Sequence, residues 1–500
     1  MDSAHDPDPD AGVSPSVWRF ARATRAHVVI DAADYFDLMQ EAMLRARQRI
    51  MLIGWDFDTR IKLGEGRRWW NLPRKETWPA RLGAFIVWLV KRDPALQVRV
   101  LKWNFGALKS VFRGTMIVDL VRWLFQRGIG FKLDAAHPLG CSHHQKIVVI
   151  DDGFAVCGGI DMTSDRWDTP EHIDLDPRRR RPAAGKLYGP WHDLTMLIEG
   201  DAARALGDLG RDRWQRAGGG VMAPCTPQDD TAWPESLQAE FTDVEIGIAR
   251  TRAAYHGAPE VREIETLYVE QIRAARRFIY AESQYFASRR IAEAIALRLA
   301  EPDPPEVLLI NPRSAEGWLE QAAMDGARVQ LCHAIGEKDT GNRFRIFVPY
   351  TSGGTPIYVH AKMMIIDDEI VRIGSANMNN RSMGLDTEAD VFIDAARPGN
   401  GHIVPAITRL RHTLLAEHCG VDMARISALL AQHGSMAAMI LALDMPGKRL
   451  EPFVLRELTD TEKAVADSAL LDPERPEDMF EPIYRRRGLF RRGGILRKPT

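Results

Sequence analysis

Histidine and lysine recur at one spacing at two places in the chain. The segments HHQKIVVIDDGFAVCGGIDM (143–162) and VHAKMMIIDDEIVRIGSANM (359–378) align without a gap. Each carries the pattern H-x-K-x4-D, with a glycine fourteen residues after the histidine. The matching residues are His144, Lys146, Asp151 and Gly158 in the first segment, and His360, Lys362, Asp367 and Gly374 in the second. Two such segments in one chain indicate a duplicated unit.

The histidine and the lysine of each motif should project together, because alternate residues of a strand point to one face. The motif aspartates stand at an odd offset beside a turn, so we expect them at the strand ends, away from the other two residues. If pseudo-twofold symmetry joins the two surfaces, one site holds two imidazoles and two ammonium groups. Such a site suits phosphoryl chemistry: lysines offset phosphate charge, one histidine attacks phosphorus, and the other protonates the leaving group. This chemistry requires no cofactor, and no metal site is expected.

Polar residues after each motif are candidates to support this site. GSANMNNRS (374–382) supplies small and amide groups near the predicted start of a helix, where backbone N–H groups favour anions. Ser375 and Asn377 are therefore candidate phosphate donors. A histidine nucleophile also needs an acceptor on its other ring nitrogen. Asp193 and Glu388 each directly precede an alternating apolar strand, and they are the candidate carboxylates.

The first motif differs from the second at the corresponding positions. Gly159 and Asp161 stand where the second segment has Ser375 and Asn377. We count Gly158 and Gly159 among the candidate phosphate-binding positions. A carboxylate facing phosphate would repel it, so Asp161 is predicted to be a helix N-cap or an orienting residue. The phosphate site should therefore be asymmetric.

Strands alternating with helices must position these residues. Apolar strand-like runs lie in 47–58 and 275–286; helical patterns in 81–94 and 291–305 precede strand patterns in 98–103 and 306–312. This alternation predicts an α/β fold with two pseudo-symmetric α/β/α halves, each a mostly parallel mixed sheet flanked by helices. The predicted divisions are a disordered segment 1–25, a first half 26–220, a linker 221–245, a second half 246–420 and an extension 421–500 with a basic tail.

Composition excludes several other classes of protein. Of the 500 residues, 45% are hydrophobic and 27% charged, which is ordinary for a globular chain. The net charge of −2 does not favour a protein that coats polyanions. Apolar runs are too short to span a bilayer, and the N-terminus lacks a Sec signal. We therefore expect a monomer that is cytoplasmic or peripheral to a membrane, with export by another route left open. The five scattered cysteines support neither a disulfide framework nor a zinc ribbon.

The paired motifs resemble those of the phospholipase D superfamily. The likeness is closest to its phospholipid-cleaving branch, which eukaryotic and some bacterial enzymes share. It is carried by YVHAKMMIIDD, GSANMNNRSM, GGIDMTSDRWD, PWHDLTMLIEG and ESQYF (282–286), and it spans roughly residues 45–400.

The resemblance implies a bilobed α/β/α fold and a phosphodiesterase mechanism through a phosphohistidine. It makes His144 the nucleophile and His360 the acid and base, with Lys146, Lys362, Ser375 and Asn377 as phosphate ligands. The motif aspartates Asp151 and Asp367, which belong to the catalytic motif, are usually structural or orienting in the family. The implied substrate is a phospholipid at a membrane surface, with water or a small alcohol as acceptor.

Two other activities of the superfamily compete with lipid hydrolysis. A cardiolipin synthase performs the same chemistry with phosphatidylglycerol as acceptor. A nuclease should have a basic groove, and the run RRRR (178–181) is such a local patch, although no nucleic-acid partner is expected. Two segments are candidates for membrane contact: Trp69 and Trp70 within 64–78, and the basic tail 485–498.

Overall fold

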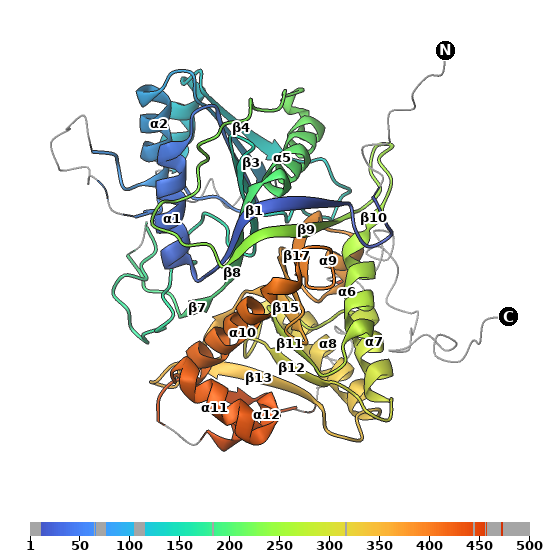
Figure 1. The fold of residues 1–500 in the computed structure, drawn as a ribbon. Coiled ribbons are helices and arrows are strands. Elements are labelled where there is room, and N and C mark those ends of the chain that lie inside the picture. Colours follow the sequence, from blue (N-terminus) through green and yellow to red (C-terminus); the bar gives the residue numbers. More distant parts are fainter. Residues whose placement is uncertain are drawn as a thin grey trace, which may run out of the picture.

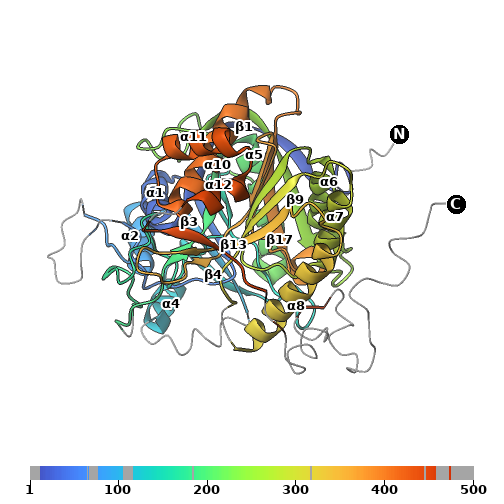
Figure 2. The same ribbon diagram turned by 90° about the horizontal axis from the view of Figure 1, so that it is seen from below.

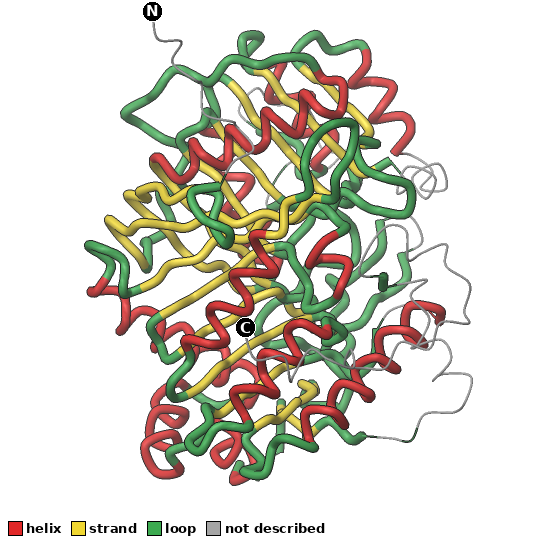
Figure 3. Tube along the Cα trace, turned by 90° about the vertical axis from the view of Figure 1, so that its right-hand side faces the viewer, coloured by secondary structure: helices red, strands yellow, loops and turns green. Residues whose placement is uncertain are grey.

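The computed structural model describes residues 12–64, 66, 77–104, 116–182, 185–315, 318–443, 446–455, 457 and 472–473. Within these residues, a sheet of 16 strands runs through the molecule, and helices cover both of its faces (Figures 1 and 3). None of the described helices combines the length and apolarity needed to cross a bilayer. Trp69, Trp70 and the basic tail lie outside the described residues.

The first half contains the motif strand β5 near its centre. Its elements are β1 (Arg19–Ile30), α1 (Ala32–Arg45), β2 (Arg49–Gly54), α2 (Leu82–Arg92), β3 (Gln97–Trp103), α4 (Met116–Leu124), β4 (Ile129–Asp134), β5 (Ile147–Ile150), β6 (Phe154–Gly158), β7 (Trp191–His192), β8 (Leu194–Gly200) and α5 (Asp201–Trp214), followed by a short π-helix (Gln215–Gly219).

The second half repeats this order and adds helices at its C-terminal end. Its elements are β9 (Phe241–Arg252), β10 (Val261–Arg262), α6 (Glu263–Ala274), β11 (Phe278–Ser283), α7 (Arg289–Leu299), β12 (Glu306–Ile310), α8 (Trp318–Gly336), β13 (Phe344–Tyr350), β14 (Tyr358–Val359), β15 (Lys362–Ile366), β16 (Ile370–Gly374), α9 (Asn380–Gly384), β17 (Glu388–Asp394), a 3-10 turn (Gly401–Ile403), α10 (Val404–Cys419), α11 (Met423–His433), α12 (Met436–Ala442) and β18 (Arg449–Pro452).

The two halves share one strand order, counted outward from the centre of the sheet. The first half reads β1-β8-β6-β5-β2-β3-β4, and the second reads β9-β17-β16-β15-β11-β12-β13. The central strands β1 and β9 pair antiparallel and join the two halves into one sheet (Figure 1). The duplication predicted from the motifs is therefore present in the topology.

The prediction of mostly parallel sheets was wrong. In the described sheet, parallel pairing is confined to β2-β3-β4 and β11-β12-β13, where helical crossovers connect the strands. The motif strands turn back tightly instead: Asp151 and Asp152 have φ of 52° and 55°, and Asp367 and Asp368 have φ of 57° and 60°. Aspartate tolerates this left-handed backbone, so β5-β6 and β15-β16 are antiparallel hairpins.

Two of the predicted boundaries also needed correction. β1 begins at Arg19, inside the segment 1–25 that was expected to be disordered, and the indole of Trp18 is buried against the core. β9 begins at Phe241, inside the predicted linker; residues 220–240 contain neither helix nor strand. In both cases polar and charged residues alternate with apolar ones on a strand, which lowers the apparent hydrophobicity of the segment.

Alternation along the strands divides the core between the two faces of the sheet. Met51 and Ile53 pack into a core that α5 and α10–α12 cover across both halves. Ile50 and Leu52 pack on the opposite face beneath α1 and α2. The corresponding face of the second half packs against α6, α7 and α8, opposite α10–α12 (Figure 2).

Candidate active site

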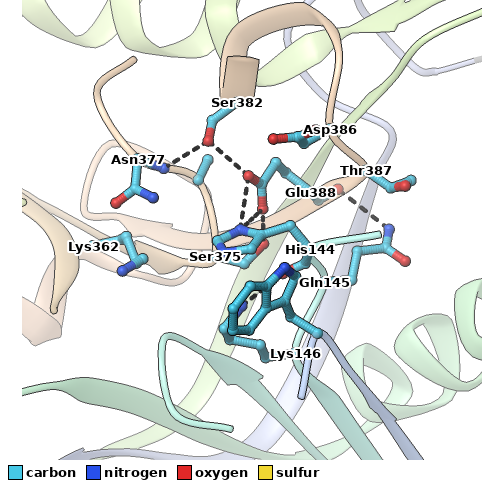
Figure 4. A network of polar contacts seen from close by, with 12 residues as sticks. His144, Gln145, Lys146, Lys362, Ser375, Asn377, Ser382, Asp386, Thr387 and Glu388 are labelled. Atoms are coloured by element: carbon cyan, nitrogen blue, oxygen red, sulfur yellow. Dashed lines mark hydrogen bonds and ion pairs between the residues drawn. The ribbon is translucent and has the colours of Figure 1, made fainter. Parts of the chain in front are cut away.

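Each motif histidine is paired with a carboxylate from the other half of the chain. His144 Nδ1 lies 3.0 Å from both carboxylate oxygens of Glu388 (Figure 4). His360 Nδ1 lies 2.6 Å from Asp193 Oδ2. The two pairs cross between the halves, so each motif histidine depends on the other half for its carboxylate.

Backbone hydrogen bonds hold each histidine beside its partner's segment. The His144 N–H donates to the carbonyl of Thr387 at 2.9 Å, directly before Glu388. The His360 N–H donates to the carbonyl of His192 at 2.7 Å, directly before Asp193, where β14 pairs in parallel with β7. The crossing is therefore built into the main chain and does not depend on the side chains alone.

The motif lysines lie on the same face as the histidines and are buried. Lys146 Nζ donates to the backbone carbonyl of its own motif histidine at 3.0 Å and lies 3.5 Å from Asp161 Oδ2. Lys362 Nζ donates to the carbonyl of its motif histidine and, at 3.1 Å, to Gln284 Oε1. Burial lowers the pKa of Lys362 to about 7, although Asp193 opposes this shift.

Burial is also the largest influence on the pKa values of the two histidine–carboxylate pairs. It raises the pKa of Glu388 to about 8 and that of Asp193 to about 7. Burial, reinforced by both motif lysines, holds the pKa of His144 and of His360 well below the ordinary value. Uncharged imidazoles are therefore favoured, and a proton on Nδ1 that is donated to the carboxylate leaves the Nε2 lone pair free to attack phosphorus.

Family models and curated proteins match this chain. The model described as "Cardiolipin synthase, PLD-like domain" matches residues 268–403, and the model described as "Phospholipase D" matches residues 349–465. The chain is 27% identical to phospholipase D alpha 1 of Nicotiana tabacum, over 73% of this chain and 60% of that protein. It is 25% identical to phospholipase D beta 1 of Arabidopsis thaliana, over 68% and 42% respectively. The chain belongs to the phospholipase D superfamily.

The fold of this superfamily member is also similar to that of a solved structure. The crystal structure of phosphatidylserine synthase from Haemophilus influenzae Rd KW20 matches with a TM-score of 0.51 and 11% identity, over 83% of this chain and 94% of that one. At this identity the match concerns the fold alone. The chain spans about half the length of the curated plant relatives named above, 60% in one case and 42% in the other.

The second-motif residues predicted to bind phosphate have different roles. The Ser375 hydroxyl donates to Glu388 Oε2 at 2.5 Å and so positions the carboxylate; its assignment as a phosphate ligand stays a prediction. Ser382, which the sequence analysis did not single out, donates to Glu388 Oε1 at 2.7 Å. Asn377 is buried beside Lys362, and its Oδ1 has no hydrogen-bond partner in the structure (Figure 4). Its side-chain amide remains the candidate phosphate donor.

The first-motif glycines make room for Asp193 and its strand. A Cβ on Gly159 would lie 2.1 Å from Asp193 Oδ1, and one on Gly158 would lie 2.4 Å from Thr195 Oγ1. The Gly159 N–H donates to the carbonyl of Leu194 at 2.9 Å, so this amide is not available to phosphate. Asp161 caps no helix; its carboxylate accepts from the Trp55 N–H at 3.2 Å and faces the Lys146 ammonium.

The motif aspartates lie at the far ends of β5 and β15 from the histidines. Asp151 accepts hydrogen bonds from the backbone N–H groups of Arg47, Gln48 and Arg49 at 2.6–2.7 Å. Asp367 accepts from Arg276, Arg277 and Phe278 at 2.7–2.8 Å. Both therefore fix the chain where it enters β2 or β11. Their place at the strand ends, away from the motif histidines, is as expected, and we assign them a structural role within the catalytic motif.

The variant Asp151→Ala should test this structural role. Loss of three charge-assisted hydrogen bonds at a partly exposed site should lower the free energy of unfolding by about 1–3 kcal/mol. Urea unfolding measures this loss, and Asp367→Ala should reproduce it in the second half. Turnover of a soluble phosphodiester per folded molecule should stay within about twofold of wild type, since the carboxylate lies away from the histidines. A large loss of kcat at unchanged stability would return Asp151 to the catalytic residues.

A second cluster of histidines and carboxylates lies buried behind Asp193. Asp31, His172, His192 and Glu417 each offer one ligand atom, and these atoms lie within 4.8 Å of one another. His192 Nδ1 lies 2.9 Å from Glu417 Oε1 and 3.2 Å from Asp31 Oδ1. His172 Nε2 lies 3.1 Å from the same Glu417 oxygen and 3.5 Å from the other Asp31 oxygen, Oδ2. A tetrahedral zinc site with bonds of about 2.0–2.1 Å has edges of about 3.3 Å. These four residues could therefore hold a divalent cation.

His172 and His192 each have a second ring nitrogen that points away from the cluster, and the partners of these nitrogens are those expected at a metal site. His172 Nδ1 lies 2.9 Å from Asp168 Oδ2, and His192 Nε2 lies 2.7 Å from Glu282 Oε2. A carboxylate on the outer nitrogen is the usual partner of a metal-ligating histidine. In the structure the nearby carboxylates raise the pKa of His172 to about 9 against the effect of burial. The sequence analysis did not single out these four residues, because they come from four separate segments of the chain.

Proposed function

We propose that this protein is a phospholipase D-type enzyme that cleaves phospholipids to phosphatidic acid and the free headgroup, or transfers the phosphatidyl group to an alcohol. The phosphodiesterase or phosphatidyltransferase chemistry and the lipid substrate are both part of this proposal, which the similarity to the phospholipase D superfamily supports. The observation that carries the reaction type is the pair of crossed histidine–carboxylate contacts flanked by two buried lysines.

The reaction begins with attack on the phosphodiester. His144 Nε2 forms a bond to phosphorus while the bond from phosphorus to the headgroup oxygen breaks. His360 reacts as its imidazolium, the minority form at its lowered pKa, and gives its Nε2 proton to the departing alkoxide. Glu388 stabilises the positive charge that develops on His144. The two motif lysines and the Asn377 amide offset charge on the phosphoryl oxygens. The product of this half-reaction is a phosphohistidine and the free headgroup alcohol.

The second half-reaction runs in reverse with a new acceptor. His360, now neutral, removes a proton from water or an alcohol, whose oxygen attacks phosphorus. The bond from phosphorus to His144 Nε2 breaks, and the imidazole returns to its pair with Glu388. Water yields phosphatidic acid, and an alcohol yields a new phosphodiester.

Product analysis tests this function directly. The protein should convert phosphatidylcholine, phosphatidylethanolamine or phosphatidylglycerol vesicles to phosphatidic acid, and added ethanol should divert product to phosphatidylethanol. Diversion is expected because a covalent phosphatidyl enzyme is open to any small alcohol that reaches it. Mass spectrometry of extracted lipids measures both products. Cleavage of DNA without cleavage of any phospholipid would overturn the proposal in favour of a nuclease.

A second candidate is transfer to a lipid acceptor. The family model for cardiolipin synthase matches residues 268–403, which include the second motif. The phosphatidylglycerol sample separates the two activities, because a cardiolipin synthase would form cardiolipin from it in preference to phosphatidic acid.

A further inference from the structure

Helix α4 turns its apolar side chains outward. Ile117, Val118, Val121, Leu124 and the following Phe125 form what we call the α4 face, and each has an exposed fraction between 45% and 80%. The positions that point inward are Met116, Asp119 and Trp123. A surface helix normally buries its apolar side chains and exposes its charged ones. α4 departs from this pattern, because it buries the charged Asp119 and leaves these apolar side chains in solvent.

Specific contacts lock α4 in this orientation. The buried Asp119 carboxylate accepts from the Thr59 hydroxyl at 2.8 Å and from Arg81 at 3.3 Å. The Trp123 ring lies 5.9 Å from that of Phe57 and 6.2 Å from that of Phe131. Rotating α4 to bury its apolar stripe would break these contacts and expose Trp123, so the outward face is a built feature of the fold.

The same loop that holds α4 also contacts the candidate nucleophile. Residues 55–59 follow β2; at one end the Trp55 ring lies 6.4 Å from the His144 ring. At the other end, Phe57 and Thr59 make the contacts to α4. The α4 face is therefore joined to the active site by one short segment.

We propose that the α4 face is the surface with which the protein docks onto a lipid bilayer. This inference rests on the proposed function, since a phospholipase must meet its substrate at a membrane. Contiguous exposed apolar residues mark an interaction surface. The charges beside them suit a bilayer with anionic lipids: Asp119 is buried, whereas Arg122 and Arg127 are exposed. Figure 2 shows α4 at the periphery of the molecule, where a flat surface can reach it.

Vesicle binding by a double variant tests the docking surface. Leu124→Asn with Phe125→Asn should weaken sedimentation with phosphatidylcholine–phosphatidylglycerol vesicles by about tenfold or more, because each side chain loses apolar area that the bilayer would cover. The matched control replaces Leu297 on α7 and Leu441 on α12 by asparagine; both are exposed apolar residues. The control should bind as wild type does.

A fluorescent label distinguishes insertion from a change in fold. All five native cysteines are buried, so a new exposed thiol can be labelled selectively. An environment-sensitive dye on Phe125→Cys should shift to shorter wavelength when vesicles are added, and the same dye on Leu297→Cys should not. Equal shifts at both positions, or none at Phe125→Cys, would overturn the proposal.

Two further results separate this inference from its alternatives. If the wild type self-associates in light scattering and the double variant does not, the α4 face is a contact between copies, and the docking proposal fails. Turnover of a short soluble phosphodiester should be equal in wild type and double variant. Wild-type binding to vesicles that depends on the α4 face, without cleavage of any lipid, would overturn the proposed function and leave the docking surface standing.

Discussion

Replacement of His144 by alanine should lower turnover by about 10⁴-fold or more, since it removes the group that forms the covalent intermediate. His360→Ala should also be inactive towards phospholipids, because the leaving alkoxide then lacks its proton donor, a loss of about 10²–10⁴-fold. The measurement is kcat on vesicles and on a soluble aryl phosphodiester. The exposed His256, beyond β9, supplies a matched control variant, His256→Ala, with wild-type rates.

The His144→Ala and His360→Ala proteins should differ in whether the phosphohistidine intermediate accumulates. An aryl leaving group needs little protonation, so His360→Ala should still form the phosphohistidine and then stall, because no base activates water. Peptide mapping at alkaline pH should find the acid-labile phosphoryl group on the peptide that contains His144. A phosphoryl group trapped on His360 in the His144→Ala protein would reverse the two roles.

The variants Glu388→Gln and Asp193→Asn should each lower kcat by about 10²–10⁴-fold with little change in KM. Each carboxylate holds one imidazole with the proton on Nδ1 and stabilises the imidazolium that forms, although neither is expected to touch the substrate. Steady-state kinetics measure the split between kcat and KM. Glu369→Gln, a partly exposed glutamate that pairs with Arg276, is the control and should leave both constants unchanged.

A pH profile separates this positioning role from a structural one. Burial raises the pKa of Glu388 to about 8, and the reactive form of the pair needs an ionised carboxylate that accepts from His144 Nδ1–H. Ionisation of Glu388 should therefore give the kcat/KM of the wild type a limb that rises with pH, which the loss of charge on Lys362, with its pKa of about 7, and on His360 opposes. Glu388→Gln cannot ionise, so its residual activity should lack that rise. The same rising limb in Glu388→Gln would contradict the assignment.

Crossed pairs also explain why the duplication produced one site and not two. Each half contributes a histidine and a carboxylate, but the contacts run between halves, over 244 residues for His144 and Glu388 and 167 for His360 and Asp193. The halves differ in how they support their carboxylate. Two serine hydroxyls hold Glu388, whereas a glycine and a backbone N–H, from Gly159 and Leu194, border Asp193. This difference gives the two histidines distinct surroundings for distinct steps.

Sequence reasoning does not separate two roles that one residue type fits equally well. Ser375 has the chemistry of a phosphate donor, and only its 2.5 Å contact shows that Glu388 receives the hydroxyl. Gly159, which follows β6, was a candidate phosphate-binding position. In the structure it is a glycine because a larger side chain would collide with the Asp193 carboxylate. The sequence analysis predicted too many parallel strand pairs, because it assumed that helices connect all the strands. The strands of each motif are instead joined by a tight turn that contains two consecutive aspartates.

The sequence by itself determined the duplication, the α/β class and the histidines and lysines of the site, because these depend on local spacing that a strand converts directly into a shared face. The tertiary structure decided which carboxylate serves which histidine, that Asp151 and Asp367 brace the chain, and that Asp31, His172, His192 and Glu417 meet. It also decided which side of α4 faces outward. Those contacts join residues that lie far apart in the sequence. The pattern of residues within one strand or helix does not show which distant part of the chain will pack against it.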